Sequence, residues 1–300
     1  MLKIAFSPVY KYELPSGHRF PMEKYELLPE QLVYEGTVSN SNFFEPQPLN
    51  REQVLLTHIP TYLEKLENNQ LSEKEQRKIG FPVTTNLFKR GLIISAGTLE
   101  CAYHALKYGI AMNIAGGTHH AYPDRGEGFC VLNDIAIASN CLLNDHMLSK
   151  ILIVDLDVHQ GNGNASIFQN NPHVFTFSMH GDRNYPLRKE KSNLDVGLPD
   201  KTGDDYYLKI LFNTLPKLID EVQPELIFYQ AGVDIMETDK LGRLRVSKSG
   251  IMKRDEFVFE CCKKNNIPIV VSMGGGYPEK LSDLIDAHAN TYRAAVKTFF

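Results

Sequence analysis

The stretch KILIVDLDVHQGNG, residues 150–163, decides the fold of this chain. Its first half is a nearly continuous apolar run without alternation, which is typical of a strand buried on both faces of a parallel sheet. Asp155, Asp157 and His159 end the run at a spacing of two. Because side chains at that spacing lie on one face of a strand, we expect the three to form a polar column at the strand's end.

The same apolar pattern recurs along most of the chain, with helix-like segments between the runs. The predicted strands are Leu2–Phe6, Ile110–Ala115, Lys150–Leu156, Val174–Met179, Leu226–Gln230 and Ile267–Met273. The predicted helices are Asn86–Tyr108, Asn133–His146, Asp204–Val222 with a kink or fresh start at Pro216, Ser247–Asn265 and Glu279–Phe299. Shorter helices are predicted at Arg51–Thr57, Thr61–Asn68 and Ser72–Lys78. This alternation predicts an α/β fold with helices on both sides of a mostly parallel sheet, in a single domain covering 1–300.

Composition excludes several classes of protein. Lys and Arg number 32 against 36 Asp and Glu, a formal net charge of −4, whereas proteins that neutralise nucleic-acid phosphates usually have a basic balance. The apolar runs are strand-sized and too short to span a bilayer, and residues 1–6 lack the features of a signal peptide. Five cysteines without regular spacing do not form a disulfide framework. We therefore expect a cytoplasmic protein that binds neither nucleic acid nor membrane.

Polar residues follow five of the predicted strands. In an open parallel sheet, ligands bind in the crevice beyond the carboxyl ends of the strands. The residues at these ends that could bind a metal or act in catalysis are His119, His120, Asp155, Asp157, His159, Asn162, His180, Asp234 and Tyr277. Because so many lie at equivalent ends, we expect them to form one site.

Asp157, His159 and Asp234 are candidates for holding a metal ion. Three protein ligands with an open position describe a catalytic zinc site, although oxygen and nitrogen donors also suit Fe²⁺, Co²⁺ or Mn²⁺. Taken alone, an Asp-x-Asp-x-His run is more often a solvated strand end, and a Gly-Gly-Gly-Tyr turn is usually only a turn. However, a buried column of carboxylates without a cation would be costly to desolvate, which favours a metal.

Five sequence blocks resemble those of the zinc-dependent histone deacetylases, and they occur in the same order. They are GGTHHA (116–121), GFCVLND (128–134), DLDVHQGNG (155–163), AGVD (231–234) and GGGY (274–277). The stretch HRFPMEKY (18–25) and the QGN variant at 160–162 are most similar to class IV deacetylases and their bacterial relatives. The resemblance implies the arginase/deacetylase fold, a three-layer α/β/α sandwich around a mostly parallel sheet.

The resemblance also implies roles for individual residues. Asp157, His159 and Asp234 match the zinc ligands, and His119 and His120 match the tandem histidines, with His120 as the general base. The further implied roles belong to Asp155 and Asn162 (orienting the imidazoles), Tyr277 (polarising the acyl carbonyl), Phe129 with Gly128 and Gly275 (lining the acyl channel) and Tyr185 (a candidate second wall). A structural potassium ion is implied as well, held at Asp155, Asp157, His159, Ser178 and Met179.

These roles imply a metal-dependent amidohydrolase that removes an acyl group from an N-acylated amine. The expected substrate is an acyl-lysine of a protein or peptide, and an acetylpolyamine or other small acyl-amine is the alternative. The chain shows no obvious insertion like the dimerisation loop of polyamine-directed members, so we expect a monomer or weak dimer. An arginase-like binuclear manganese hydrolase is disfavoured by the Asp-x-Asp-x-His order. A non-catalytic binding module is disfavoured because no ligand is missing.

The segment between His180 and Pro199 departs from the family pattern. It carries a charged run, Arg188–Lys191, in place of the commoner aromatic channel segment. The acidic rim residue that many members use to hold the substrate backbone is not identifiable either. Both departures bear on the choice of substrate. Arg19 is hypothesised to reach the inner end of the channel, and Cys130 is expected to pack at its base.

Overall fold

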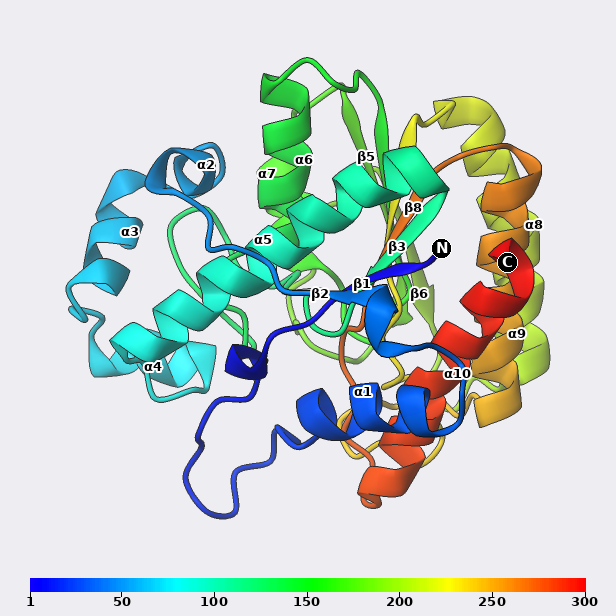
Figure 1. The fold of residues 1–300 in the computed structure, drawn as a ribbon, viewed down its shortest axis with the longest axis horizontal. Helices are drawn as coiled ribbons and strands as arrows, with labels where there is room; N and C mark the ends of the chain where they lie inside the picture. Colours follow the sequence, from blue (N-terminus) through cyan, green and yellow to red (C-terminus); the bar gives the residue numbers. More distant parts are fainter.

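A sheet of eight parallel strands runs through the centre of the molecule (Figure 1). The computed structural model describes all 300 residues. The strands are β1 (Lys3–Ala5), β2 (Phe43–Phe44), β3 (Ile110–Asn113), β4 (Ile151–Asp155), β5 (Val174–Gly181), β6 (Leu194–Leu198), β7 (Leu226–Gln230) and β8 (Ile269–Ser272). Their order across the sheet is β2-β1-β3-β8-β7-β4-β5-β6, with every neighbouring pair parallel. All residues of β3, β4, β7 and β8 are buried, as their unbroken apolar runs require.

Helices cover both faces of the sheet and complete a three-layer α/β/α sandwich (Figure 1). One layer contains α5 (Thr85–Tyr108), α6 (Asp134–Asn144) and α7 (Asn162–Phe168), with α5 packed along β1, β3 and β8. The opposite layer contains α1 (Lys24–Tyr34), α8 (Asp204–Val222), α9 (Lys248–Lys264) and α10 (Leu281–Phe299). The short helices α2 (Arg51–Leu55), α3 (Pro60–Glu67) and α4 (Glu73–Ile79) gather beside α5 at the left of Figure 1.

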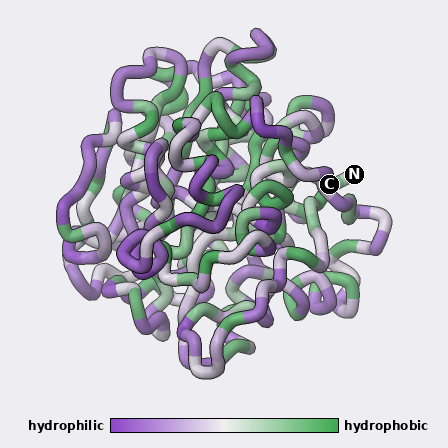
Figure 2. The backbone as a smooth tube through the Cα atoms, turned by 90° about the vertical axis from the view of Figure 1, so that its left-hand side faces the viewer, coloured by the Kyte–Doolittle hydropathy of each residue, from purple (hydrophilic) through white to green (hydrophobic).

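One continuous cluster of buried apolar residues joins the three layers. Figure 2 shows hydrophilic stretches along much of the outline and hydrophobic stretches mostly further in. The two termini lie close together in both views (Figures 1 and 2). None of the helices combines the length and the apolar character needed to cross a bilayer.

The six predicted strands and the eight predicted helices are all present, with ends that shift by a few residues. The strand of the opening stretch ends at Asp155, so Asp157 and His159 lie in the following loop and not on the strand. Helix α8 continues through Pro216, so of the two expectations there, a kink or a fresh start, the fresh start is wrong. Proline has no N–H to donate, so the helix loses one hydrogen bond at this position. Burial of Leu215 and of the other apolar residues on the same face of α8 offsets this loss. The helices α1 and α7 and the edge strands β2 and β6 were not predicted.

The strand order brings the polar strand ends together. The strands β3, β8, β7, β4 and β5 are consecutive across the sheet, and the candidate site residues follow these strands. Along this row the chain order reverses, because β4 to β6 proceed toward one edge while β7 and β8 return on the other side of β4. Ligand sites in open parallel sheets form at such switch points, beyond the carboxyl ends of the strands.

Candidate active site

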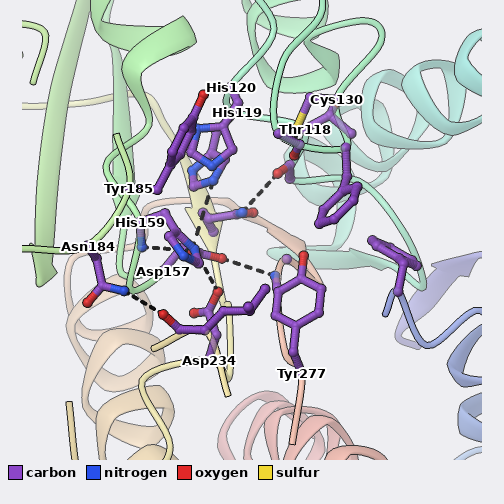
Figure 3. A pocket seen from close by; sticks show the side chains of 18 of the residues that line it. Thr118, His119, His120, Cys130, Asp157, His159, Asn184, Tyr185, Asp234 and Tyr277 are labelled. Atoms are coloured by element: carbon purple, nitrogen blue, oxygen red, sulfur yellow. Dashed lines mark hydrogen bonds and ion pairs between the residues drawn. The ribbon is translucent and has the colours of Figure 1, made fainter. Parts of the chain in front are cut away.

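The centre of the site is a group of three ligand atoms from two strand-end loops. His159 Nδ1 lies 3.1 Å from Asp157 Oδ1 and 3.1 Å from Asp234 Oδ2 (Figure 3). The second oxygen of each carboxylate is held by the backbone, since Gly275 N donates to Asp157 Oδ2 and Val158 N donates to Asp234 Oδ1. One oxygen of each carboxylate and the imidazole nitrogen therefore face a common point.

This donor set fits a divalent cation. Asp157 is 1% exposed and Asp234 is 0% exposed, and two carboxylates buried together are unfavourable without a positive charge. Burial and the neighbouring Asp157 raise the pKa of Asp234 to about 7. Two oxygens and one imidazole nitrogen match a catalytic zinc site, and Fe²⁺ or Co²⁺ accepts the same donors. The adjacent loop passes so close that a Cβ at Gly275 would lie 2.2 Å from Asp234 Oδ2, so only glycine fits there.

His119 and His120 follow β3 and lie beside the ligand atoms, with their ring centroids 4.1 Å apart. His119 Nδ1 is 2.7 Å from Asp155 Oδ2, and its Nε2 is 3.9 Å from Asp157 Oδ1. Burial opposes a charge on His119, but the carboxylates of Asp155 and Asp157 outweigh burial and raise its pKa to about 9. In this environment the His119 imidazole is cationic at neutral pH.

His120 has an uncharged partner instead. Its Nδ1 lies 2.6 Å from Asn162 Oδ1. Burial and the neighbouring imidazoles lower the pKa of His120 well below its usual value, so this ring is neutral near pH 7. The Asn162 amide nitrogen lies 3.0 Å from the Tyr122 hydroxyl and 3.2 Å from Glu127 Oε1. The tandem histidines therefore differ in charge, and only the neutral one is able to accept a proton.

An aromatic wall flanks the site. Phe129 packs against Phe20, Phe81 and Tyr277, with ring centroids 5.3, 5.1 and 6.0 Å away. Its φ of 67° is unusual for a bulky side chain, and the N–H groups of Gly128 and Phe129 are pinned by carbonyls in the last turn of α4. Backbone strain of this kind concentrates at functional sites, which agrees with the channel position predicted for Phe129.

Two tyrosines lie on opposite sides of the ligand atoms (Figure 3). Tyr277 follows β8, its N–H donates to Asp239 Oδ2 at 2.6 Å, and its hydroxyl points into the pocket. The Tyr185 ring stands perpendicular to that of His120, with centroids 5.0 Å apart, and its hydroxyl donates to Glu127. The structure therefore places Tyr185 in the pocket wall, where the sequence suggested it as a candidate.

The structure brings most of the predicted site residues into one pocket of about 390 Å³. Those that line it are His119, His120, Gly128, Phe129, Asp157, His159, Tyr185, Asp234, Gly275 and Tyr277. Asp155 and Asn162 lie behind the two histidines, and Ser178 is paired with Asp155 in the register of β4 and β5, followed by Met179. Cys130 is buried, and burial raises the pKa of its thiol, as suits a packing residue.

The arginine at the buried part of the pocket is not the one hypothesised from the sequence. Arg19 is exposed and lies 5.1 Å from the centre of the Phe129 ring, so it stands at the outside of the channel. Arg90 of α5 lines the buried part instead, where its Nε donates to the Tyr10 carbonyl at 2.6 Å. Arg90 and the pocket-lining Phe20 were missed, because one arginine in an apolar helix and one loop phenylalanine form no motif of their own.

Solved structures share this architecture. An HDAC homologue crystallised with SAHA matches the chain with a TM-score of 0.85, covering 99% of this chain and 84% of that one at 23% identity. An HDAC homologue from Aquifex aeolicus matches with a TM-score of 0.84, covering 98% and 84% at 23% identity. Together with the eight-stranded parallel sheet, these matches define a protein of the three-layer arginase/deacetylase fold, as the sequence predicted.

Sequence comparison then gives the family. The model of the histone deacetylase domain matches residues 18–292. An uncharacterised protein of Picosynechococcus is 42% identical over 292 residues, covering 97% of each chain. Histone deacetylase 2 of Arabidopsis thaliana is 31% identical over 285 residues, covering 89% of this chain and 72% of its own length. Human histone deacetylase 1 is 28% identical over 291 residues, covering 90% and 59%. The chain belongs to the histone deacetylase family and is a deacetylase of that family.

Proposed function

We propose that this deacetylase removes acyl groups from the Nε atom of lysine in proteins or peptides, using a zinc ion held by Asp157, His159 and Asp234. One observation carries the proposal. Three ligand atoms, a cationic and a neutral imidazole and a tyrosine hydroxyl converge in a single pocket of about 390 Å³. Amide hydrolysis needs a Lewis acid, a base, an acid and an oxyanion donor, and this set supplies all four.

The bound ion would supply Lewis acidity, which polarises the acyl carbonyl and lowers the pKa of water. His120 is neutral and its Nδ1 is engaged by Asn162, so its Nε2 can take the proton of the attacking water. The cationic His119 can protonate the amine as the C–N bond breaks. The Tyr277 hydroxyl can donate to the acyl oxygen as negative charge develops there. The products are a carboxylate and a free amine.

The potassium ion implied by the resemblance is part of the proposal. It would lie beside β4 and β5, where Asp155 and Ser178 are paired in register and both side chains are buried. Carbonyl and carboxylate oxygens are suitable ligands for a hard cation. If the ion binds there, the unfolding temperature is higher in KCl than in choline chloride at equal ionic strength, and equal temperatures would contradict the site.

The proposal is tested by turnover on several acyl-amines. The protein is stripped with chelator, reloaded with Zn²⁺, Fe²⁺ or Co²⁺, and offered acetyl-lysine peptides, long-acyl-lysine peptides and acetylpolyamines. We expect release of an acyl group from a lysine peptide that disappears with chelator and returns at one metal per chain by elemental analysis. Release from no substrate contradicts the function. Faster turnover of acetylpolyamines than of lysine peptides would identify a small acyl-amine, and not acyl-lysine, as the substrate. Two metals per chain would favour an arginase-like centre.

A further inference from the structure

The outer part of the pocket, which we call the mouth, is lined by four exposed basic residues. They are Arg19, Lys78, Arg183 and Arg243. The carboxylates among the pocket-lining residues are Asp157 and Asp234, which face the proposed zinc ion. The mouth is therefore basic, although the whole chain carries a formal charge of −4.

The basic side chains stand on both sides of the mouth. Arg19 lies over the Phe129 ring, and the carbonyl of Lys78 accepts the N–H of the adjoining Gly128. On the side of Tyr185, Arg183 precedes Asn184, whose Oδ1 accepts the backbone N–H of Arg243 at 3.2 Å. A substrate that enters the pocket therefore passes between two pairs of cations.

The cations of the mouth are incompletely paired. Arg19 and Lys78 form no ion pair. Arg183 and Arg243 share one carboxylate, because both approach Asp200 Oδ2, at 3.9 and 3.3 Å. The mouth keeps an excess of positive charge after this pairing is counted.

Other nearby carboxylates do not line the pocket, and their oxygens are turned toward other partners. Glu127 pairs with Arg125, whose Nε lies 3.6 Å from Glu127 Oε2, and accepts hydrogen bonds from Asn162 and Tyr185. Asp239 accepts backbone N–H groups, including that of Tyr277, and Glu190 accepts the hydroxyl of Tyr122 at 3.0 Å. A cleft lined by one sign of charge focuses the field and attracts ligands of the opposite sign.

We propose that the mouth binds an anionic group of the substrate, so that the preferred acyl-amines carry carboxylates close to the acylated amine. This inference rests on the deacylase function proposed above. An acyl-lysine flanked by Asp or Glu in a peptide has the required chemistry, and so does a small acyl-amine with its own carboxylate. A polycationic acetylpolyamine is repelled by the same charges.

The test compares three acetyl-lysine peptides of one length, with acidic, neutral or basic flanking residues. Free Nε-acetyl-lysine and its carboxamide form a small-molecule pair that differs in one carboxylate. At low ionic strength we expect kcat/KM to fall from acidic to neutral to basic flanks, by about tenfold in total and mainly through KM. A preference confined to the small-molecule pair assigns the anion to a small substrate. Equal or reversed values overturn the anion site.

Charge-reversal variants locate the effect. Lys78→Glu and Arg183→Glu are each expected to reduce the acidic preference several-fold, mainly through a higher KM for the acidic peptide. Arg77→Glu and Arg188→Glu are matched controls, because both arginines are exposed neighbours outside the pocket lining. If the controls lower the preference for acidic peptides as much as the mouth variants do, the negative charge of the peptide is not recognised at the mouth and the inference fails.

Binding separates this inference from the proposed function. Fluorescence anisotropy of labelled peptides with the Tyr277→Phe variant measures the preference without turnover. Absence of hydrolysis on every peptide would refute the function, whereas tighter binding of the acidic peptide would still support the anion site. Equal binding of acidic and basic peptides, with hydrolysis of the neutral peptide intact, refutes the anion site alone.

A second inference concerns Glu127 and rests on different contacts. Asn162 Nδ2 lies 3.2 Å from Glu127 Oε1, while Asn162 Oδ1 lies 2.6 Å from His120 Nδ1. An ionised carboxylate has no proton to donate, so the amide must turn its NH₂ group toward Glu127 and its oxygen toward His120. His120 Nδ1 must then be the donor, which leaves the lone pair on Nε2.

We infer that Glu127 is a positioning residue that fixes the orientation of Asn162 and, through it, the tautomer of His120. A direct aspartate partner would need no such support, because both of its oxygens accept. Here the carboxylate stands one hydrogen bond further away, and it also receives the hydroxyl of Tyr185. Asn162, which is the partner of the proposed base His120, and Tyr185, which forms one wall of the channel, therefore both donate hydrogen bonds to Glu127.

Relocating the charge tests this role. Glu127→Gln can present either an oxygen or an NH₂ group to Asn162, so we expect kcat to fall about tenfold with KM and metal content unchanged. Combining it with Asn162→Asp places a carboxylate directly against His120, and we expect kcat to rise above that of Glu127→Gln alone. Glu190→Gln, which alters a carboxylate beyond Tyr122, is the matched control and is expected to have the smaller effect.

A merely structural role for Glu127 would not produce recovery in the double variant, because that variant carries one more substitution. Thermal unfolding of all variants verifies that each one folds. Full activity of Glu127→Gln, or a double variant no better than Glu127→Gln, would overturn the positioning role.

Discussion

The floor of the pocket, formed by Asp157, His159, Asp234 and the tandem histidines, contrasts with the mouth in how its polar groups are satisfied. At the floor, one oxygen of each aspartate accepts a backbone N–H while the other faces the ligand point beside His159 Nδ1, and both carboxylates are almost completely buried. At the mouth, the side chains of Arg183 and Arg243 are 76% and 57% exposed and share one carboxylate. This difference leads us to expect that substitutions at the strand ends change the reaction and that substitutions in the surrounding loops change the choice of substrate. Substitutions in the two regions should separate these properties.

The largest effect is expected from Asp234→Asn at the floor. The amide keeps an oxygen that accepts the backbone N–H of Val158, but the site loses one anionic ligand atom. We expect loss of stoichiometric zinc by elemental analysis and activity below detection on every peptide. Because burial and Asp157 raise the pKa of Asp234 to about 7, the substitution relieves repulsion in the metal-free protein. The metal-free variant should therefore unfold at no lower temperature than the metal-free wild type.

Asp205→Asn, an exposed substitution in the first turn of α8, is the matched control and should retain both metal and activity. Full zinc content with normal turnover in Asp234→Asn would show that the floor does not depend on this ligand. The contrast between floor and mouth would then lose its basis.

Tyr277→Phe should have the next largest effect. The ring can keep its contacts with Phe129 and Phe20, while the hydroxyl that points into the pocket is removed. Loss of one oxyanion donor typically lowers kcat about 100-fold to 1,000-fold, and we expect a fall of that order with unchanged metal content. Steady-state kinetics on the neutral peptide measures it, with the exposed Tyr206→Phe as the control. A variant that turns over at the wild-type rate would remove Tyr277 from the reaction.

The floor could be predicted from the sequence, and the mouth could not, for a physical reason. Asp157, His159 and Tyr277 follow apolar runs that predict buried parallel strands, so their convergence follows from the strand ends. Lys78 and Arg243, in contrast, come from a short helix and a long loop whose approach to the pocket depends on tertiary packing. No periodicity in the sequence marks that approach.

The surroundings of the tandem histidines were likewise only partly predictable from the sequence. Family resemblance paired Asn162 with an imidazole, and the structure shows that pair at 2.6 Å. Glu127 behind Asn162 was not found, because it lies in a loop with no recurring spacing to residue 162. The predicted strand Lys150–Leu156 was also one residue too long at each end, since β4 spans Ile151–Asp155. The chain leaves the strand at Asp155, whose side chain then accepts the backbone N–H of Asp157 at 3.2 Å.

Asp155→Asn should give a smaller effect than either substitution above. Asp155 does not line the pocket, but its carboxylate holds His119 Nδ1 at 2.7 Å and helps to raise the pKa of that imidazole to about 9. Without this charge His119 should lose its proton more readily. Removal of such a supporting group typically costs about 10-fold to 100-fold in activity, and we expect the loss in kcat with little change in KM.

Asp182→Asn, an exposed carboxylate outside the pocket lining, is the control for Asp155→Asn. The comparison is made on the neutral peptide, so that the charge of the mouth does not enter. If Asp155→Asn changes KM and leaves kcat unaltered, Asp155 acts on substrate binding and not on the reaction. The proposed division between a floor that carries out the reaction and a mouth that binds the substrate would then be wrong for this residue.

The smallest effect is expected from salt, and it acts on the mouth alone. Screening shortens the reach of exposed charges from about 10 Å at 0.1 M to about 3 Å at 1 M ionic strength, whereas buried pairs are screened much less. With KCl held constant, added NaCl should therefore reduce the preference for acidic over basic peptides several-fold. The kcat on the neutral peptide should stay unchanged, because the floor is buried and its charges are hydrogen-bonded. A parallel fall of both quantities would mean that the floor is open to ions, and that substrate choice and chemistry share one electrostatic environment.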